Sequence, residues 1–343
     1  MGRWGRLCAR MKKSGCVIIV LFLAVCGSMF VNLLLFGALV GMKGSSVASV
    51  RTLQEREFDE VVLRDGGSGK GKIAVIPLAG VISHGAAGSL GDDLVEDFKL
   101  ALDQAQKDPE VKAIVISVDS PGGEITASDV LYNSLGLFSK SKPSVVYFNS
   151  LGASGAYYMA CGSSYIMCNA TTFTGSIGVI ISTLNYRDLF GKIGLQSVVF
   201  KSGKFKDMLN GGREMSPEEQ AYVQSLVMQS YDRFVGIVAR ARGLDEKELR
   251  EGVADGRILS GTDAFAAKLV NQLGYIEDAY AKARELGGVP EAKIVRYKRV
   301  VTFASLFKIF GSAKAPEIKV DMLQGMPKLE PGRVYLLPPF FAP

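Results

Sequence analysis

Short apolar runs alternate with longer amphipathic stretches through the middle of this 343-residue chain. Short runs without polar alternation are typical of strands buried on both faces of a parallel sheet, and stretches with helical periodicity are typical of amphipathic helices. Their alternation predicts βαβ units and therefore an α/β fold with a largely parallel sheet. We expect strands at Ile73–Leu78, Ala113–Val118, Ser144–Phe148, Tyr165–Cys168 and Gln196–Lys201, and helices at Asp92–Gln106 and Glu124–Ser139.

A longer helix is expected to begin after Ser216 and to continue to about Arg242. Pro217 would occupy its first position, and Glu219 follows Ser216 at the spacing of a capping box. Apolar residues recur along one side of this stretch, so we expect that side to pack against the rest of the domain.

An uncharged apolar run over residues 15–41 follows a basic segment, residues 1–14. At ~1.5 Å per residue this run is long enough to cross a bilayer core of ~30 Å, and it is too long for a cleaved signal peptide. Lysine and arginine before the run favour a cytoplasmic N-terminus. We therefore expect one transmembrane helix, a signal anchor over residues 15–41, with the rest of the chain outside the cytoplasm.

Three segments follow the expected anchor. Residues 42–72 are polar and become rich in glycine, which predicts a flexible tether. Residues 73–288 contain the alternating elements and form the main domain, and the role of the tail, residues 289–343, is open. The glycine-rich end of the tether superficially resembles a phosphate-binding loop. Ile73 stands where such a loop needs Ser or Thr to bind magnesium, and the tract precedes a strand, so nucleotide binding is not expected.

Composition narrows the function further. The formal net charge is +6, but several of the cations precede the apolar run, so the charge does not indicate a nucleic-acid partner. With a single histidine, His84, no Cys/His metal cluster can be assembled. Cys161 and Cys168 are the two cysteines of the main domain, and their small or apolar neighbours predict buried, unpaired thiols.

Two glycine-rich turns, Asp119–Gly123 and Asn149–Ala156, each follow an expected strand. In a parallel sheet such turns meet at the carboxyl ends of the strands, where free backbone N–H groups can stabilise an oxyanion. Ser154 lies between small residues in the second turn and is the candidate nucleophile. The turn nearly spells a G-x-S-x-G elbow, but that fold needs a histidine after the serine, and His84 precedes it.

A lysine therefore has to act as the general base. Burial or neighbouring cations can lower the pKa of a lysine enough to make the neutral amine available. Three candidates, Lys201, Lys204 and Lys206, lie close together after an expected strand, and residue chemistry alone does not distinguish among them.

Five ordered motifs resemble the signal peptide peptidase A family, also called the protease IV family, in its short single-domain form. The motifs are Asp119–Gly123, Ala153–Tyr158, Thr174–Val179, Lys201–Asp207 and Ala254–Arg257. The resemblance covers roughly residues 73–286 and implies a ClpP/crotonase-like spiral of βαβ units. It also implies a serine peptidase that needs no cofactor and no metal.

By this resemblance Ser154 is the nucleophile and Lys206 is the base of a Ser/Lys dyad. Ser176 resembles a hydroxyl that orients the lysine. The implied oxyanion hole consists of backbone N–H groups from Gly122, Gly123 and Gly155.

The resemblance also implies partners and a location. Family members form homo-oligomeric rings in which neighbouring subunits can share an active site, and they cleave remnant signal peptides and other hydrophobic peptides. The expected location is the bacterial inner (cytoplasmic) membrane, with a single pass and an extracytoplasmic catalytic domain. Two rival functions are a crotonase-type acyl-CoA hydratase or isomerase and a non-catalytic, peptide-binding membrane scaffold. The first rival does not explain the apolar run or the paired Ser154 and Lys206.

Overall fold

The computed structural model describes residues 22–32, 58–67, 71–85, 93–299 and 335–336. The chain forms two compact units, Met1–Glu57 and Phe58–Pro343. In the first unit residues 22–32 are helical with exposed side chains, and the remainder of the expected transmembrane helix, residues 15–41, lies outside the described residues. Among the residues that are described, no helix is both long enough and apolar enough to span a bilayer.

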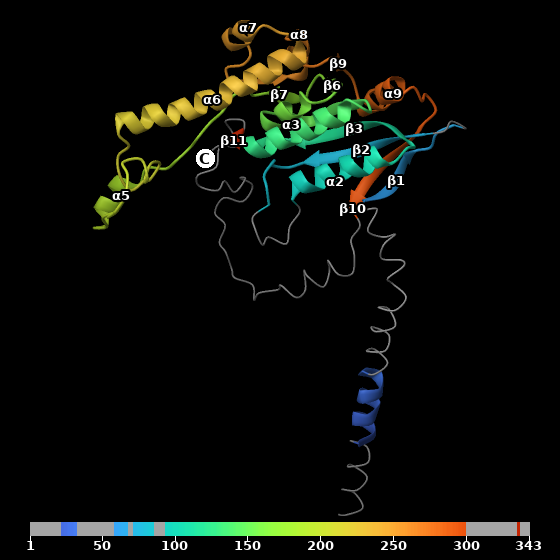
Figure 1. Cartoon of the computed structure of the whole chain (residues 1–343), viewed down its shortest axis with the longest axis horizontal. Helices are drawn as coiled ribbons and strands as arrows, with labels where there is room; N and C mark the ends of the chain where they lie inside the picture. The colour runs from blue at the N-terminus through green and yellow to red at the C-terminus, as the bar shows by residue number, and fades with distance from the viewer. Residues whose placement is uncertain (1–21, 33–57, 68–70, 86–92, 300–334, 337–343) are drawn as a thin grey trace, which may run out of the picture. The chain divides into compact units, whose positions relative to one another are not determined.

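Within the described part of the second unit, nine strands form one mixed sheet (Figure 1). Neighbouring strands follow the order β1-β10-β2-β3-β5-β6-β9, with β7 paired to β5 and β8 paired to β7. The strands from β10 to β9, and β7 beside β5, run parallel, whereas β1 and β8 are antiparallel to their neighbours. The strand bounds are β1 Phe58–Arg64, β2 Lys72–Ala79, β3 Val111–Ser120, β5 Ser144–Ala153, β6 Tyr165–Cys168, β7 Phe173–Gly175, β8 Ile258–Ser260, β9 Gln272–Leu273 and β10 Lys293–Arg299.

Helices on both faces explain why the central strands are apolar runs. Alternate residues of these strands contribute to two hydrophobic clusters: Ile116 packs in the cluster that contains Phe98 and Leu131, and Val115 packs in the cluster that contains Ala283. The central sheet is therefore buried on both faces, as the sequence predicts. The helices concerned are α2 Leu94–Lys107, α3 Ile125–Ser139 and α4 Gly155–Ala160 for the first cluster and α9 Ile276–Leu286 for the second.

Helix α6, Pro217–Arg242, confirms the prediction of a capped long helix. The Ser216 hydroxyl accepts a hydrogen bond from the Glu219 N–H at 3.2 Å, and the Glu219 carboxylate accepts one from the Ser216 N–H at 2.9 Å. The helix ends at Gly243, whose φ of 64° suits glycine. Only its second half enters the core, through residues 234–239. Two short helices, α7 Glu246–Glu251 and α8 Gly261–Ala266, follow.

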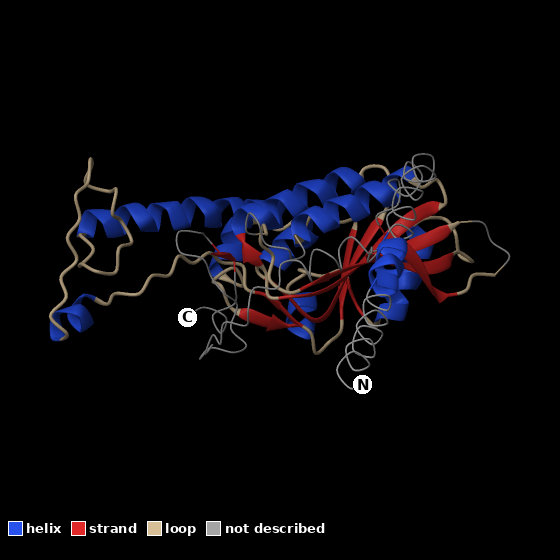
Figure 2. Ribbon diagram, turned by 90° about the horizontal axis from the view of Figure 1, so that it is seen from below, coloured by secondary structure: helices blue, strands red, loops and turns tan. Residues whose placement is uncertain are grey.

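We call residues 181–232 the arm. It contains α5, Arg187–Lys192, and the first part of α6, and it extends away from the sheet in both views (Figures 1 and 2). All residues of the arm are described, and among them only Gly211 and Glu219 are buried. An apolar core therefore does not hold the arm together.

Three features differ from the sequence-based expectations. The strand expected at Gln196–Lys201 is wrong: this segment lies in the arm, where no described strand pairs with it, and the Phe200 side chain is 96% exposed. Strand β1 lies within the expected tether, and β10 lies within the tail. Both escape detection because exposed and buried residues mix along them and no continuous apolar run forms: β1 is the edge strand, and β10 lies between β1 and β2.

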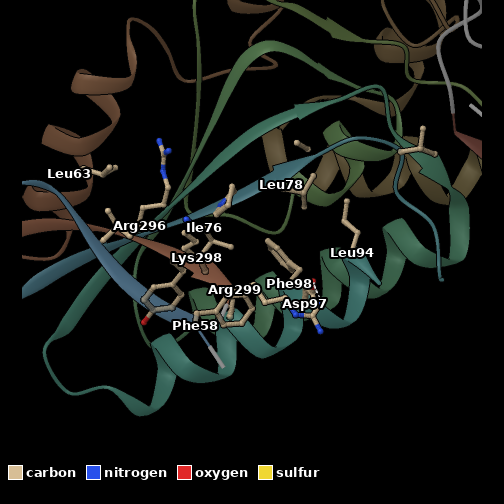
Figure 3. Close-up of a pocket in the computed structure, with 16 residues that line it drawn as sticks. Phe58, Leu63, Ile76, Leu78, Leu94, Asp97, Phe98, Arg296, Lys298 and Arg299 are labelled. Atoms are coloured by element: carbon tan, nitrogen blue, oxygen red, sulfur yellow. Dashed lines mark hydrogen bonds and ion pairs between the residues drawn. The ribbon is translucent and has the colours of Figure 1, made fainter. Parts of the chain in front are cut away.

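A cavity of about 780 Å³ lies between α2 and strands β1, β2 and β10 (Figure 3). Phe58, Leu78 and Phe98 contribute to its apolar lining, and an ion pair at 2.6 Å between Arg299 and Asp97 lies at its edge. None of the predicted catalytic residues lines this cavity.

Cys161, at the end of α4, and Cys168, at the end of β6, are buried and free, as the sequence predicts. Burial raises the pKa of both thiols to about 12.

Candidate active site

Ser154 occupies a sharp turn between β5 and α4, at the carboxyl end of a central strand. Its backbone has φ 53° and ψ −116°, a conformation that a residue with a side chain rarely adopts. Its N–H donates to the Gly175 carbonyl at 2.8 Å, and its carbonyl accepts from the Tyr158 N–H at 2.8 Å. The side chain is buried, yet Oγ makes no hydrogen bond with any residue that the structure describes. A buried hydroxyl in this condition calls for a functional explanation.

Gly155, the first residue of α4, packs against the turn that follows β3. A methyl group on Gly155 would lie 2.4 Å from Ser128 Oγ and 3.0 Å from Gly123 N. Gly122 has a φ of 95°, and its N–H donates to Ser120 Oγ at 3.1 Å. The N–H of Gly155 has no acceptor within its own helix, because it lies in the first turn. The two glycine turns therefore meet beside Ser154.

Ser176 lies next to this turn. Gly175 pairs with Ala153 across β7 and β5, and Ser176 follows with a φ of 50° and a buried side chain. Its N–H donates to the carbonyl of Arg257 at 2.8 Å. Ser176 and Arg257 both line a cavity of about 400 Å³. Ser154 itself does not line this cavity.

The three candidate lysines lie in the arm. Lys201 pairs with Asp207 at 2.6 Å, and Lys204 pairs with Glu218 at 2.5 Å. Lys206 is exposed, and its ammonium forms no ion pair with a described residue. The arm, which contains all three lysines, extends away from the sheet (Figures 1 and 2).

Comparison with known proteins identifies the family. The model of peptidase family S49 matches residues 137–290, a range that contains both Ser154 and Lys206. A candidate signal peptide peptidase SppA of Enterococcus faecium is 36% identical over 293 residues, which cover 82% of this chain and 84% of that protein. The chain belongs to peptidase family S49.

Two further similarities concern activity and fold. The chloroplastic serine protease SPPA of Arabidopsis thaliana is 30% identical to this S49 peptidase over 231 residues, which cover 66% of the chain and 34% of that protein. A solved ClpP1 mutant from Listeria monocytogenes has a TM-score of 0.41 and 14% identity, covering 60% of this chain and 94% of that chain. The structural likeness supports no further argument at that score. The sequence relatives show that this S49 peptidase is a serine peptidase of the SppA family.

The structure of this S49 peptidase also contains an ionic cluster that sequence reasoning missed. Arg213 donates to Asp207 at 2.7 and 2.8 Å and to Glu219 at 2.5 and 2.9 Å. Glu219 is visible in the sequence as a capping residue, and Asp207 follows Lys206. Their shared partner could not be predicted, because only the folded arm brings Arg213 between them. We call Lys201, Asp207, Arg213 and Glu219 the arm cluster.

Acid is expected to loosen the arm before the core. Hydrogen bonds from Arg213 lower the pKa of Glu219 to about 2 and also lower the pKa of Asp207, with help from Lys201. Because both folded values lie below the unfolded values of about 4, the stabilisation is fully present above roughly pH 5 and is lost as the pH falls toward 2. Amide exchange in residues 203–219, corrected for its intrinsic pH dependence, should therefore increase over this range while exchange in β3 does not. Unchanged protection of the arm at pH 2 would contradict the prediction.

Proposed function

We propose that this protein is a membrane-anchored endopeptidase that uses Ser154 as nucleophile and Lys206 as general base. The observation that carries the proposal is the Ser154 hydroxyl, which is buried and without a hydrogen-bond partner among the described residues. It lies beside the meeting point of the Gly155 and Gly123 backbones. A nucleophile in a strained turn beside backbone N–H groups is the arrangement that acyl transfer requires.

The ion pairs of the arm favour Lys206 over the other two lysines. Lys201 and Lys204 are each engaged by a carboxylate, at 2.6 and 2.5 Å, and would have to leave that partner to reach Ser154. Lys206 has no such partner among the described residues.

The reaction follows from these positions. Neutral Lys206 Nζ takes the proton of Ser154 Oγ, and the oxygen attacks the carbonyl carbon of the peptide bond. Backbone N–H groups of the two glycine turns hold the resulting oxyanion. The tetrahedral intermediate then breaks its C–N bond, and the leaving amine receives the proton from the Lys206 ammonium. Water, deprotonated by the same lysine, hydrolyses the acyl ester and restores Ser154.

Gly155 and Gly123 are the preferred oxyanion donors. The Gly122 N–H already donates to Ser120 Oγ, and the Ser154 N–H already donates to the Gly175 carbonyl. Gly155 lies in the first turn of α4, and Gly123 N would lie 3.0 Å from a methyl group added at Gly155. The role that the motif assigns to the Gly122–Gly123 pair therefore falls to Gly123.

A homo-oligomeric ring would supply the missing lysine from a neighbouring subunit. The arm, which contains Lys206, extends away from the sheet and carries a set of exposed apolar side chains. Such a concentration of exposed apolar residues favours an interface between copies. The exposed apolar residues of α5 and the segment after it are Leu184, Tyr186, Leu189, Ile193, Leu195, Val198, Val199 and Phe200.

The substrate would bind as an extended peptide along β4, Gly123–Glu124. Strand β11, Tyr335–Leu336, pairs antiparallel with β4, with Leu336 opposite Gly123. The β4 edge beside the nucleophile therefore accepts an extended segment, which is the mode of β-strand addition. With a relative named as a signal peptide peptidase, we propose remnant signal peptides and other hydrophobic peptides as the substrate class.

The proposed location is the bacterial inner membrane. The uncharged run over residues 15–41 supports a single pass, and the basic residues 1–14 support a cytoplasmic N-terminus. This orientation places the catalytic unit on the extracytoplasmic side, where remnant signal peptides remain in the bilayer.

Covalent labelling tests the proposal. A fluorophosphonate probe should label Ser154 of the full-length protein in detergent and should fail to label Ser154→Ala, Lys206→Ala or heat-unfolded wild-type protein. Absence of labelling in the folded wild-type protein would favour the peptide-binding scaffold. Labelling of Lys206→Ala at the wild-type rate would remove the lysine from the mechanism.

A further inference from the structure

The arm cluster fastens the turn that carries Lys206 to the first turn of α6. Arg213 lies between the two carboxylates, and the side chains of Asp207 and Glu219 are 8% and 4% exposed. Glu219 also accepts the Ser216 N–H at 2.9 Å. One guanidinium thus joins the residue next to Lys206 to the capping box of α6.

Few other contacts hold this turn. Backbone hydrogen bonds from the Lys206 N–H to the Gly203 carbonyl and from the Asn210 N–H to the Asp207 carbonyl, both 3.1 Å, close the turn on itself. Phe205 contacts the ring of Tyr222 on α6 at 5.4 Å between centroids. Two charged connections therefore join the turn to the helix: the exposed Lys204–Glu218 pair at 2.5 Å and the arm cluster, whose carboxylates are nearly buried.

From this geometry we propose that Arg213 is a positioning residue that sets both the place and the charge state of Lys206. This inference rests on the proposed role of Lys206 as general base. Arg213 fixes the backbone at residue 207 through two parallel hydrogen bonds to a nearly buried carboxylate. Displacement of a base by about 1 Å can reduce a rate by about a hundredfold, so rigidity here affects the chemistry.

The second effect is electrostatic. Arg213 and Lys201 together occupy both oxygens of the Asp207 carboxylate. Without Arg213, that carboxylate loses its main partner and becomes available to the ammonium of Lys206, its neighbour in the chain. Such a contact would stabilise the protonated lysine and make it a weaker base at neutral pH. Arg213 therefore keeps Asp207 from capturing the lysine.

Steady-state cleavage of a hydrophobic peptide by the full-length protein in detergent tests the inference. Arg213→Ala should lower kcat about a hundredfold with KM within about threefold, and Arg213→Lys should recover little because an ammonium cannot bridge two carboxylates with a planar fork. The rising limb of the kcat profile should move to higher pH by about one unit in Arg213→Ala, and should return in Arg213→Ala/Asp207→Asn. If Arg213→Ala lowered kcat only because the protein unfolded, adding Asp207→Asn would not restore the pH profile.

A matched control exists on the same arm. Arg187 pairs with Glu214 at 2.8 Å and with Asp188 at 2.9 Å, and these side chains are largely exposed. Arg187→Ala should keep kcat within about twofold, because exposed pairs contribute little. If Arg213→Ala keeps kcat within about twofold, as Arg187→Ala should, the inference is wrong. It is also wrong if kcat falls while the pH profile of kcat stays in place and adding Asp207→Asn does not change that profile.

Mixed oligomers separate this inference from the proposed function. Co-expressed Ser154→Ala and Lys206→Ala chains should regain activity if arms act on neighbouring subunits, at up to about one quarter of the sites. Ser154→Ala with Arg213→Ala should regain the same activity, because one chain supplies the intact arm and the other the serine. Lys206→Ala with Arg213→Ala should gain nothing.

Recovery in the first mixture together with wild-type kinetics of Arg213→Ala would overturn the inference and leave the dyad intact. Failure of the first mixture would instead overturn catalysis across subunits, and the kinetics of Arg213→Ala alone would then decide the inference.

Discussion

Replacing Lys206 by alanine should lower kcat/KM by about a thousandfold or more, while Lys204→Ala should stay within about threefold of wild type. The difference follows from their partners. Lys204 forms an exposed pair with Glu218, with both side chains about two-thirds exposed, so its loss should affect neither site nor fold. Lys206 has no pair among the described residues and is the proposed proton acceptor. Cleavage of a fluorogenic peptide with a hydrophobic sequence measures both variants.

The pH dependence of the wild-type enzyme checks the same assignment. Since the neutral amine is the active form, kcat should rise with pH and then level off. A Lys206→Ala enzyme that retained the rising limb would show that another group is the base.

Gly155→Ala should lower kcat about a hundredfold or more with the fold intact. The added methyl would lie 2.4 Å from Ser128 Oγ and 3.0 Å from Gly123 N, so the two glycine turns must separate. Their separation moves both proposed oxyanion donors, each of which is worth roughly 3 kcal/mol in the barrier. Adding Ser128→Ala removes the closer clash but not the contact with Gly123, so it should recover only part of the activity.

Gly136→Ala is the matched control for this variant. Gly136 lies within α3, where a methyl group would meet its nearest neighbour, the Gly162 carbonyl oxygen, at 3.9 Å. Alanine is the better helix former by about 1 kcal/mol, so this variant should be fully active and slightly more stable. Equal activity of the two variants would contradict the proposed oxyanion hole.

The central sheet and the Ser154 turn were predictable because their physics is local. A continuous apolar run without polar alternation indicates a strand that is buried on both faces. A turn of small residues directly after it indicates a tight connection to the following helix. The capping box at Ser216 likewise determines where α6 begins. Exclusion of histidine as base followed from composition alone.

Strands β1 and β10 and the arm were not predictable for the opposite reason. Strands β1 and β10 pair across more than 200 positions of sequence, and their mixed burial leaves no periodic signal. Val198 to Phe200 have the composition of a strand, but tertiary structure places them where nothing described pairs with them. The choice of Lys206 depended on family resemblance. The ion pairs that engage Lys201 and Lys204 could not be predicted from the sequence, because they form only in the folded arm.

The two core cysteines have a consequence for the compartment in which this enzyme is proposed to work. A thiol reacts with oxidants or disulfides as the thiolate, and a pKa of about 12 leaves almost none of it at neutral pH. Burial also denies reagents access to either sulfur. The stability of the core should therefore not depend on redox potential, and it should be the same in a reducing cytoplasm and in an oxidising compartment. Folding of the catalytic unit should then need neither a thiol oxidase nor a disulfide isomerase.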